Sequence, residues 1–571
     1  MSQRAAVLLA SHGHKVEVEL AGPPGAMADA VRAVDPDLVL CPFLTHRVPA
    51  EVWSRYRTVI IHPGPVGDRG PSSLDWAIAG DAPAWGVTAL QAVEDFDAGP
   101  VWATREFALP GGGGLGGPRK SELYNGPVAD LAMELIEEVA VKAADPEFAP
   151  VPVPPESGVV RPLMRQADRV FDWAADPAAI VRRIRAADGA PGVRTRLCGV
   201  ELMAYDAHPG PASPEPRLLD AEYAEFADYA DYARPGTVLA RKHGAVLVRA
   251  GGGGSVWIGR AKAVPDDGGR GIKLPATDVL ADQLARLAVP DHSSLFDPVA
   301  SAPGAGGFQE IVYRRQGSLG RLTFDFYNGA MSTSQCRRLF LALRHAVEQD
   351  TAALVLEGGT VFSNGIDLNT IEAAANPALE AWENINAIND ICREIITCAA
   401  QPLIVAVSGN AGAGGVMLGL GAHHVVVRSG VVLNPHYATM GLYGSEYWTY
   451  TLPRRTGRAT AERLTRECQP IDAVEAVRLG LADAVGPADR GRFESWLLDQ
   501  ARRLAAEPAR SQLLDAASAR LEADERRKPL SAYRAEELAQ MSQDMFADRN
   551  GFADARAAFV YKMAKRTPAT A

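Results

Sequence analysis

Short apolar runs that alternate with amphipathic stretches cover most of the 571-residue chain. Near its start, the pattern predicts helices around 7–12 and 27–34, an alternating strand over 15–20, and buried strands over 37–41 and 58–61. Strands that alternate with helices are typical of an open α/β sheet, whose ligands bind at the carboxyl ends of the strands. We therefore expect an open parallel sheet with a site where the 58–61 strand ends.

Segments rich in proline, serine and glycine at 150–155 and 286–307 are typical of linkers. A chain of this length also exceeds what one hydrophobic core can organise. The sequence therefore predicts three domains, at 1–150, 160–285 and 308–571.

The second predicted domain contains short strands separated by glycine turns, which is typical of a small β-barrel. Its expected strands are 237–239, 245–248 and 256–258. In the third domain, the apolar run at 353–356 predicts a buried strand, and a glycine-rich turn at 409–415 precedes an expected buried helix over 416–422. Two β-branched runs, 425–427 and 431–433, predict further buried strand segments.

The net charge of −11 favours neither a nucleic-acid backbone nor an anionic membrane surface as a partner. Six scattered cysteines, with no C-x-x-C pair, fit free thiols in a reducing compartment. Neither an 18-residue apolar run nor a signal-peptide pattern is present. The histidines show no metal-ligand spacing beyond the adjacent His423 and His424, which more often pack against a strand. We expect a cytoplasmic protein without a metal.

His62 follows the 58–61 strand and begins a rigid proline- and glycine-rich loop, a suitable place for acid–base chemistry. A lone loop histidine is more often structural, but its surroundings carry a further pattern. An Arg69–Gly70 pair, a G-V-T strand at 86–88 and Asp97 before a nearby glycine follow in order. This order resembles the formyltetrahydrofolate-dependent formyltransferases.

The resemblance implies 10-formyltetrahydrofolate as cosubstrate, Arg69 as a folate contact, and proton handling by His62 with Asp97 orienting its imidazole. The family's catalytic asparagine falls on Ile60. A thiol acceptor, more nucleophilic than an amine near neutral pH, needs less help from that asparagine. The family also opens with a strand before its first helix, whereas this chain begins inside the helix, so we expect a misassigned start.

The third domain contains two loop motifs, FSNGIDL at 362–368 and GNAGAGG at 409–415. Their order and spacing match those of two loops of a known enzyme superfamily. Together they resemble the crotonase (enoyl-CoA hydratase) superfamily, an α/β spiral fold. A glycine-rich turn can present backbone N–H groups to the developing oxyanion of an acyl group. The resemblance places the two oxyanion-hole amides on Ile366 and Gly414.

The catalytic glutamates of hydratases fall on Met417 and Tyr437, and neither side chain can act as a carboxylate base. Hydration of a double bond is therefore not expected. For coenzyme A, the resemblance suggests contacts at Gly365 and Arg556. An exposed cation on an amphipathic helix is an equal explanation of Arg556.

A formyltransferase-like half joined to a crotonase-like half resembles a family of hydrogenase-maturation proteins. That resemblance implies formyl transfer from 10-formyltetrahydrofolate to coenzyme A, then cleavage of formyl-CoA into CO and CoA, with Tyr437 and Glu446 as candidate proton-handling groups. Hydrogenase-maturation proteins are then possible partners. Two alternatives stay open: a formyltransferase fused to an acyl-CoA hydratase or isomerase, and a non-catalytic folate- and CoA-binding scaffold. Oligomeric state and a cavity shared by the two sites also stay open.

Overall fold

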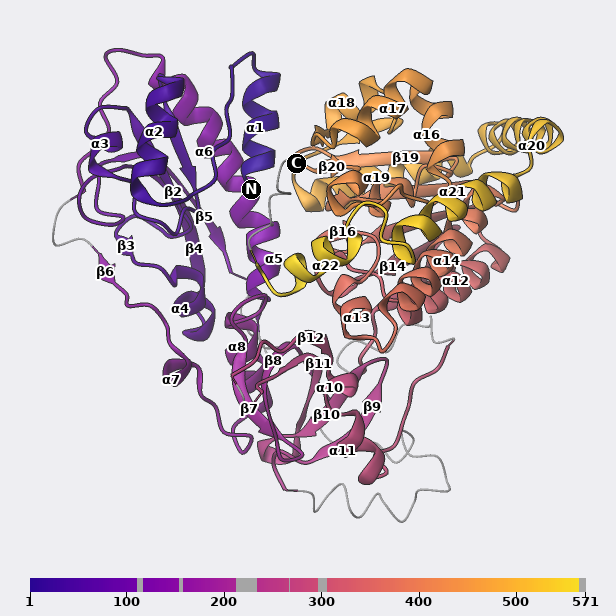
Figure 1. Cartoon of the computed structure of the whole chain (residues 1–571), viewed down its shortest axis with the longest axis horizontal. Coiled ribbons are helices and arrows are strands. Elements are labelled where there is room, and N and C mark those ends of the chain that lie inside the picture. The colour runs from indigo at the N-terminus through magenta and orange to yellow at the C-terminus, as the bar shows by residue number, and fades with distance from the viewer. Residues whose placement is uncertain (110–116, 154–157, 212–233, 266–267, 296–305, 564–571) are drawn as a thin grey trace. The chain divides into compact units, whose positions relative to one another are not determined.

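The computed structural model describes residues 1–109, 117–153, 158–211, 234–265, 268–295 and 306–563 (Figure 1). They form two compact units. Unit 1 comprises residues 1–264, 275–292 and 304–308, and unit 2 comprises residues 265–274, 293–303 and 309–571. The expected linkers lie partly outside the described residues, at 154–157 and 296–305. The three predicted domain boundaries stay a prediction.

A four-stranded sheet of order β1-β2-β4-β5 forms the first part of unit 1. Its strands are β1 (Val39–Pro42), β2 (Thr58–His62), β4 (Ala84–Gln91) and β5 (Val101–Ala108). The strands predicted at 37–41 and 58–61 are confirmed, and they pair in parallel. The sheet is mixed, however: the expected parallel pairing holds for β1–β2, whereas β2–β4 and β4–β5 pair antiparallel. A short connection such as that from β4 to β5 can join only antiparallel strands.

The two helices predicted near the start are confirmed as α1 (Ser2–Ser11) and α2 (Pro24–Val34). The strand predicted between them is wrong, because residues 15–20 adopt no regular structure. Val18 and Leu20 are 56% and 81% exposed. An alternating pattern indicates a strand only where another element covers its apolar face, and here only Val16 is partly buried against the core.

The second part of unit 1 is an antiparallel sheet of order β7-β8-β11-β10-β9 that curves around its own core (Figure 1). All three predicted strands are confirmed. Helix α8 (Pro177–Ala186) packs on this sheet and begins with Asp176, whose carboxylate accepts the Ala178 and Ala179 N–H groups. The strands are β7 (Val193–Leu197), β8 (Val200–Pro209), β9 (Val238–Lys242), β10 (Ala245–Arg249) and β11 (Ser255–Ala263).

A buried ion cluster joins the two parts of unit 1. Asp75, in α4 (Ser73–Ala79), accepts hydrogen bonds from Lys120 Nζ at 3.1 and 3.2 Å and from Arg169 Nη2 at 2.5 Å. Asp75 and Arg169 are buried, so neither partner can be lost without leaving a charge away from water. The other elements of the chain up to residue 292 are α3 (Ala50–Trp53), β3 (Asp68–Arg69), α5 (Lys120–Asn125), α6 (Pro127–Ala143), β6 (Val159–Val160), α7 (Gln166–Arg169), β12 (Lys273–Pro275), α10 (Ala276–Val279) and α11 (Ala281–Arg286).

Unit 2 contains two sheets, of order β13-β14-β15-β17-β19-β22 and β16-β18-β20-β21. In the larger sheet, β14 to β22 run parallel and are covered on both faces. Successive residues of β15 therefore point into two different cores, which explains why the sequence reads as a continuous apolar run. The strands are β13 (Ile311–Gln316), β14 (Leu319–Phe324), β15 (Ala353–Gly358), β16 (Val361–Ser363), β17 (Leu403–Val407), β18 (Asn410–Gly412), β19 (His424–Arg428), β20 (Val432–Asn434), β21 (Ile471–Asp472) and β22 (Ala484–Gly486).

The predicted buried helix over 416–422 is only partly correct. Helix α15 begins at Gly414 and ends at Met417, and turns follow it. The two β-branched runs after it are confirmed as strands, but β19 and β20 belong to different sheets. The chain therefore crosses between the sheets here.

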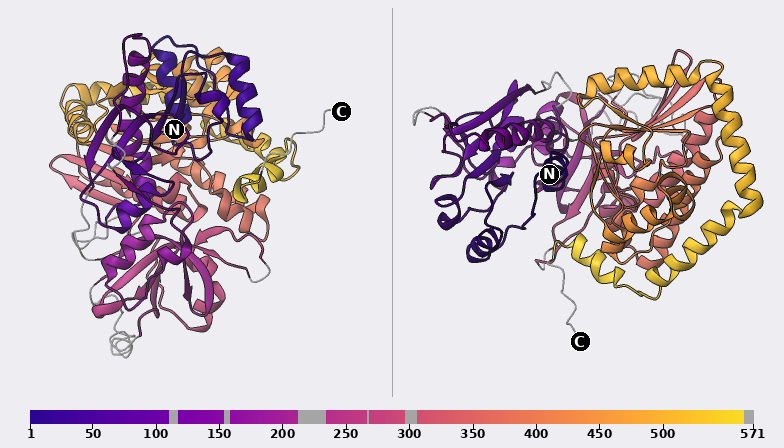
Figure 2. Two further views of the ribbon diagram at one scale, coloured as in Figure 1. Left: turned by 90° about the vertical axis from the view of Figure 1, so that its left-hand side faces the viewer. Right: turned by 90° about the horizontal axis from the view of Figure 1, so that it is seen from above.

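Helices surround both sheets of unit 2. Helices α12 and α14 pack together over one face of the larger sheet, α19 covers the other face, and α20 to α22 run along the outside of the unit (Figure 2). No helix within the described residues is long and apolar enough to cross a membrane. The helices are α12 (Thr333–Glu348), α13 (Leu368–Ala373), α14 (Pro377–Ile396), α16 (Trp448–Thr456), α17 (Arg458–Glu467), α18 (Ala473–Arg478), α19 (Arg490–Ala505), α20 (Ala509–Arg527), α21 (Leu530–Met545) and α22 (Phe552–Val560).

The buried ion cluster yields a stability prediction. Asp75→Asn removes the charge that compensates the buried Arg169 and the partly buried Lys120, and should destabilise unit 1 by about 3–5 kcal/mol. Calorimetry should show the unfolding transition of unit 1 lowered by about 10 °C. Asp37→Asn, at an exposed carboxylate, is the control and should leave the transition in place. If Asp75→Asn and Asp37→Asn unfolded at the same temperature, the stabilising role of Asp75 would be contradicted.

Candidate functional site

His62 is the last residue of β2, and two carboxylates bracket its imidazole. Its Nε2 lies 3.0 Å from Asp68 Oδ2, and its Nδ1 lies 3.4 Å from Asp97 Oδ1. The structure therefore brings together the predicted pair, His62 and Asp97, and adds Asp68. Carboxylates on both ring nitrogens fix the plane of the ring, which suits a group that accepts and returns protons.

The local backbone is shaped around this group. A β-carbon at Gly64 would lie 2.4 Å from His62 Nε2 and 2.5 Å from Asp68 Oδ2, so only glycine fits there. Asp97 has a left-handed φ of +52°, and its Oδ2 accepts a hydrogen bond from Gly70 N at 3.2 Å. The loop after β4 is thereby tied to the loop after β2.

Arg69, the predicted folate contact, lies in β3 next to Asp68. β3 pairs with β6 through the backbone. The Arg69 side chain makes no hydrogen bond or ion pair with another residue that the structure describes. It is therefore available to a ligand.

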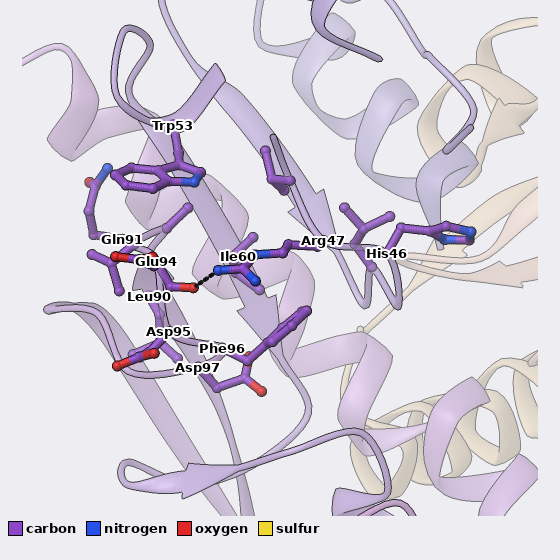
Figure 3. Close-up of a pocket in the computed structure, with 14 residues that line it drawn as sticks. His46, Arg47, Trp53, Ile60, Leu90, Gln91, Glu94, Asp95, Phe96 and Asp97 are labelled. Atoms are coloured by element: carbon purple, nitrogen blue, oxygen red, sulfur yellow. Dashed lines mark hydrogen bonds between the residues drawn. The ribbon is translucent and has the colours of Figure 1, made fainter. Parts of the chain in front are cut away.

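A pocket lies beside this group, and Asp97 forms part of its wall (Figure 3). Apolar side chains line one part of it, including Trp53, Ile60 and Leu90. Arg47 donates a hydrogen bond to the Glu94 carbonyl at 2.6 Å and so closes part of the rim. The pocket combines apolar walls with polar groups, which is typical of a small-molecule site.

In unit 2, the two predicted oxyanion-hole residues come from loops that meet. A β-carbon on Gly365, whose φ is +75°, would lie 3.3 Å from Gly414 N. Met331 N donates to Gly365 O at 2.9 Å, which holds the first loop. Among the described residues, neither the Ile366 nor the Gly414 N–H donates a hydrogen bond. Two adjacent loops thus carry two uncommitted backbone donors, as binding of an acyl oxygen requires.

Glu446 lies beside the predicted oxyanion hole. A β-carbon on Gly414 would lie 2.1 Å from Glu446 Oε1, so the carboxylate packs directly on the glycine backbone. Its Oε2 accepts hydrogen bonds from Tyr437 Oη at 2.7 Å and from Ser445 N at 3.0 Å. Its Oε1 accepts none from any described residue. Glu446 therefore points a free oxygen at the predicted oxyanion hole.

The environment of Glu446 changes its acidity. Burial raises the pKa of Glu446 to about 7, although the hydrogen bonds from the Tyr437 hydroxyl and the Ser445 amide act to lower it. Burial and the neighbouring carboxylate raise the pKa of Tyr437 well above its ordinary value. Tyr437 is thus a hydrogen-bond donor near neutral pH, and Glu446 can exchange a proton there.

Two other residues singled out in the sequence of unit 2, Met417 and Arg556, are buried in the structure. Met417, on which the resemblance places a glutamate of hydratases, is buried in the largest hydrophobic core of unit 2. Arg556 is also buried, so the expectation of an exposed cation is wrong. Its Nε donates to Glu372 Oε2 at 2.6 Å, between α22 and α13. Any contact of Arg556 with CoA stays a prediction.

Sequence reasoning missed two groups. Asp68 lies only six positions after His62, but its carboxylate carried no signal that separated it from a loop residue. Glu537 lies in α21 and bonds to residues 445–449, about ninety positions earlier. No local pattern marks such a contact. No cluster of three or more His, Cys, Asp or Glu side chains suited to a metal occurs in the part of the chain that the structure describes.

Comparison with known proteins identifies both halves. Residues 163–265 match the family "Formyl transferase, C-terminal domain", and residues 318–564 match "Enoyl-CoA hydratase/isomerase". A methionyl-tRNA formyltransferase of Acidiphilium cryptum is 34% identical over 26% of this chain and 46% of its own length. The fold and the site thus define a multidomain α/β protein that joins formyltransferase domains to a crotonase-fold domain.

Two relatives match nearly the whole chain. The hydrogenase maturation factor HoxX of Bradyrhizobium diazoefficiens is 39% identical over 100% of this chain and 94% of its own length. The crystal structure of HypX from Aquifex aeolicus in complex with tetrahydrofolic acid has a TM-score of 0.89 and 35% identity, covering 99% of this chain and 95% of that one. This chain belongs to the HypX/HoxX family of hydrogenase maturation factors.

The contact between Tyr437 and Glu446 yields a prediction for acidity. Tyr437→Phe removes a hydrogen bond that favours the ionised carboxylate, so the pKa of Glu446 should rise above about 7. Infrared spectroscopy across a pH series should show the protonated carboxyl band of Glu446 persisting to higher pH, with the band assigned by its loss in Glu446→Gln. A band that titrates at the wild-type pH would contradict the contact.

Proposed function

We propose that this protein transfers a formyl group from 10-formyltetrahydrofolate to coenzyme A, and then cleaves formyl-CoA into CO and CoA. The observation that carries the proposal is the free Glu446 oxygen, which lies against Gly414, one of the two residues with an uncommitted amide, at a site that lacks the second carboxylate of a hydratase. Such a site can polarise a carbonyl and move one proton, but it cannot hold and activate water between two carboxylates.

For the first step, the group around His62 supplies proton transfer. His62 accepts the thiol proton of CoA as sulfur bonds to the formyl carbon, and the folate nitrogen regains a proton as its bond to that carbon breaks. Asp97 orients the imidazole, as carboxylate partners do in other acid–base pairs. The pocket beside Asp97, walled by Ile60 and Trp53, suits a flat ring system with polar edges.

For the second step, the N–H groups of Ile366 and Gly414 polarise the formyl oxygen, and Glu446 Oε1 removes the formyl hydrogen as a proton. The electrons of the C–H bond become the lone pair of CO, and those of the C–S bond leave with sulfur. Glu446 then returns the proton to the thiolate. No oxidant and no water are consumed. Tyr437 keeps Glu446 in position by its hydrogen bond at 2.7 Å.

The family indicates the use of the product. Hydrogenase maturation factors act on hydrogenases, and we propose that the CO becomes the ligand of the iron in a nickel–iron active site, with other maturation proteins as partners. All six cysteines are free thiols, which agrees with the cytoplasm as the proposed location.

The coupled reaction is the first test. Wild-type protein with 10-formyltetrahydrofolate and CoA should release CO, trapped by deoxymyoglobin and measured by its Soret shift. Release should need both substrates. It should fall by about 10²–10⁴-fold in His62→Ala, because a positioned acid–base group is lost.

Two outcomes would overturn the proposal. Formyl-CoA that accumulates without CO, together with turnover of crotonyl-CoA, would favour a formyltransferase fused to a hydratase or isomerase. Tight binding of both ligands without consumption of either would favour a scaffold.

The second half can be tested alone by supplying formyl-CoA. Glu446→Gln should lower the rate of CO release by at least about 10²-fold, because the amide cannot accept the formyl proton. Its formyl transfer from folate to CoA should stay at the wild-type rate. The matched control is Glu462→Gln, at an exposed carboxylate of α17. CO release by Glu446→Gln at the rate of this control would exclude Glu446 as the base.

A further inference from the structure

Glu537 is a fully buried carboxylate in α21 that binds one short segment of the crotonase-like unit. Its Oε2 accepts hydrogen bonds from Tyr447 N at 2.9 Å and from Ser445 Oγ at 3.3 Å. Its Oε1 accepts hydrogen bonds from Thr449 N at 2.8 Å and Thr449 Oγ1 at 2.5 Å. Both oxygens are thus used by the segment that contains Glu446.

The backbone of this segment needs support. Glu446 and Tyr447 have φ values of +61° and +57°, two consecutive left-handed residues with side chains. This conformation is unfavourable for L-residues and persists only where surrounding contacts fix it. Asn389, in α14, supplies further contacts: its Oδ1 accepts from Glu446 N at 2.8 Å, and its Nδ2 donates to Ser445 Oγ at 2.9 Å.

These contacts form one buried chain. Asn389 binds the Glu446 backbone on one side, Glu537 binds the backbone on the other, and both meet at the Ser445 hydroxyl. With its backbone held in this way, the Glu446 side chain places Oε2 beside the Tyr437 hydroxyl and Oε1 beside Gly414. The hydrogen bonds made with Asn389 and Glu537 therefore position Glu446 Oε1, the oxygen that the proposed reaction uses.

We propose that Glu537 is a positioning residue that holds Glu446 in the conformation needed to take the formyl proton. This inference rests on the proposed function, which gives Glu446 its role. Glu537 does not touch the reacting atoms and acts through the backbone of residues 445–449.

A carboxylate suits this position better than an amide. All four groups that bind Glu537 are N–H or O–H donors, and only a carboxylate offers two oxygens that both accept. A glutamine would turn its own NH₂ group toward one pair of these donors. The segment would then lose contacts on one side, and the Glu446 carboxyl would shift.

Glu537 also affects the acidity of Glu446. Among the described residues, the ionisable groups around Glu446 include Tyr437, Tyr447, Glu537, Cys336 of α12 and Cys392 of α14, and none of these is cationic. Burial is the first cause that raises the pKa of Glu446 to about 7, and the charge of Glu537 raises it further. Burial also raises the pKa of Glu537 to about 7, so this charge develops over the same pH range. Replacing Glu537 by a neutral group should therefore lower the pKa of Glu446.

The experiment compares Glu537→Gln with Glu536→Gln, which removes the neighbouring exposed carboxylate of the same helix. With formyl-CoA supplied, Glu537→Gln should lose about 10²-fold in the rate of CO release, as expected for a misplaced reacting group, with KM near the wild-type value. The midpoint at which the rate rises with pH should move to lower pH. Glu536→Gln should match wild type in all three quantities.

Two further measurements keep the inference testable. Thr449→Ala removes one hydrogen bond to Glu537 and should slow CO release less than Glu537→Gln does, while Thr449→Ser, which keeps the hydroxyl, should restore it. The infrared carboxyl band of Glu446 reports its position and titration without any turnover. It should shift in Glu537→Gln and stay unchanged in Glu536→Gln.

The outcomes separate the two proposals. Wild-type protein that releases no CO from formyl-CoA would overturn the proposed function, while an altered Glu446 band in Glu537→Gln would still support the positioning role. Equal rates, pH midpoints and Glu446 bands in Glu537→Gln and Glu536→Gln would overturn the positioning role alone. A slower Glu537→Gln whose pH midpoint and Glu446 band are those of wild type would also overturn it, because Glu537 would then be only structural.

Discussion

A buried carboxylate packed against a glycine backbone is the constraint on which the crotonase-like unit depends. Glu446 Oε1 occupies the space that a β-carbon at Gly414 would need, so these two residues restrict each other. No lysine or arginine pairs with Glu446 among the described residues. An unpaired buried carboxylate is costly, and here hydrogen bonds from Tyr437 and Ser445 offset part of that cost. The left-handed backbone at residues 446 and 447 and its contacts with α14 and α21 hold this one group in place.

The two halves depart from their relatives in a related way. In unit 1, the resemblance places the catalytic asparagine of formyltransferases on Ile60, which forms part of an apolar pocket wall. In unit 2, the resemblance places a glutamate of hydratases on Met417, which is buried in the core. Each predicted change removes a polar group, whereas His62 and Asp97 lie together and the N–H groups of Ile366 and Gly414 stay uncommitted among the described residues. Under the proposed function these groups move protons and polarise a carbonyl, which are the requirements of a thiol acceptor and of a C–S cleavage.

The sequence predicted most of the fold because buried parallel strands such as β15, β17 and β19 must be apolar on both faces. It failed at 15–20, where alternation occurs without a covering element, and at α15, where a glycine-rich start suggested a longer helix than the four residues observed. The direction of β4 was also missed, because the direction in which a strand pairs depends on its neighbours in the folded sheet and not on its own sequence. For the site, loop motifs led to His62, Asp97 and Gly414. Glu537 could not be found that way, because only folding brings α21 to the segment after η5 (Tyr437–Met440).

Burial of Glu446 also bears on the choice between two fates of a formyl thioester. Attack by water would give formate, whereas loss of the formyl proton gives CO. A hydratase positions water between two carboxylates, and the resemblance places those two positions on the buried Met417 and on Tyr437, whose hydroxyl is bound to Glu446. Glu446 is only 1% exposed, so few water molecules can reach its oxygens. Under the proposed function, exclusion of water from this carboxylate favours removal of the formyl proton over attack by water. The same burial raises the pKa of Glu446 to about 7, which suits the proposed uptake of the formyl proton and its return to sulfur.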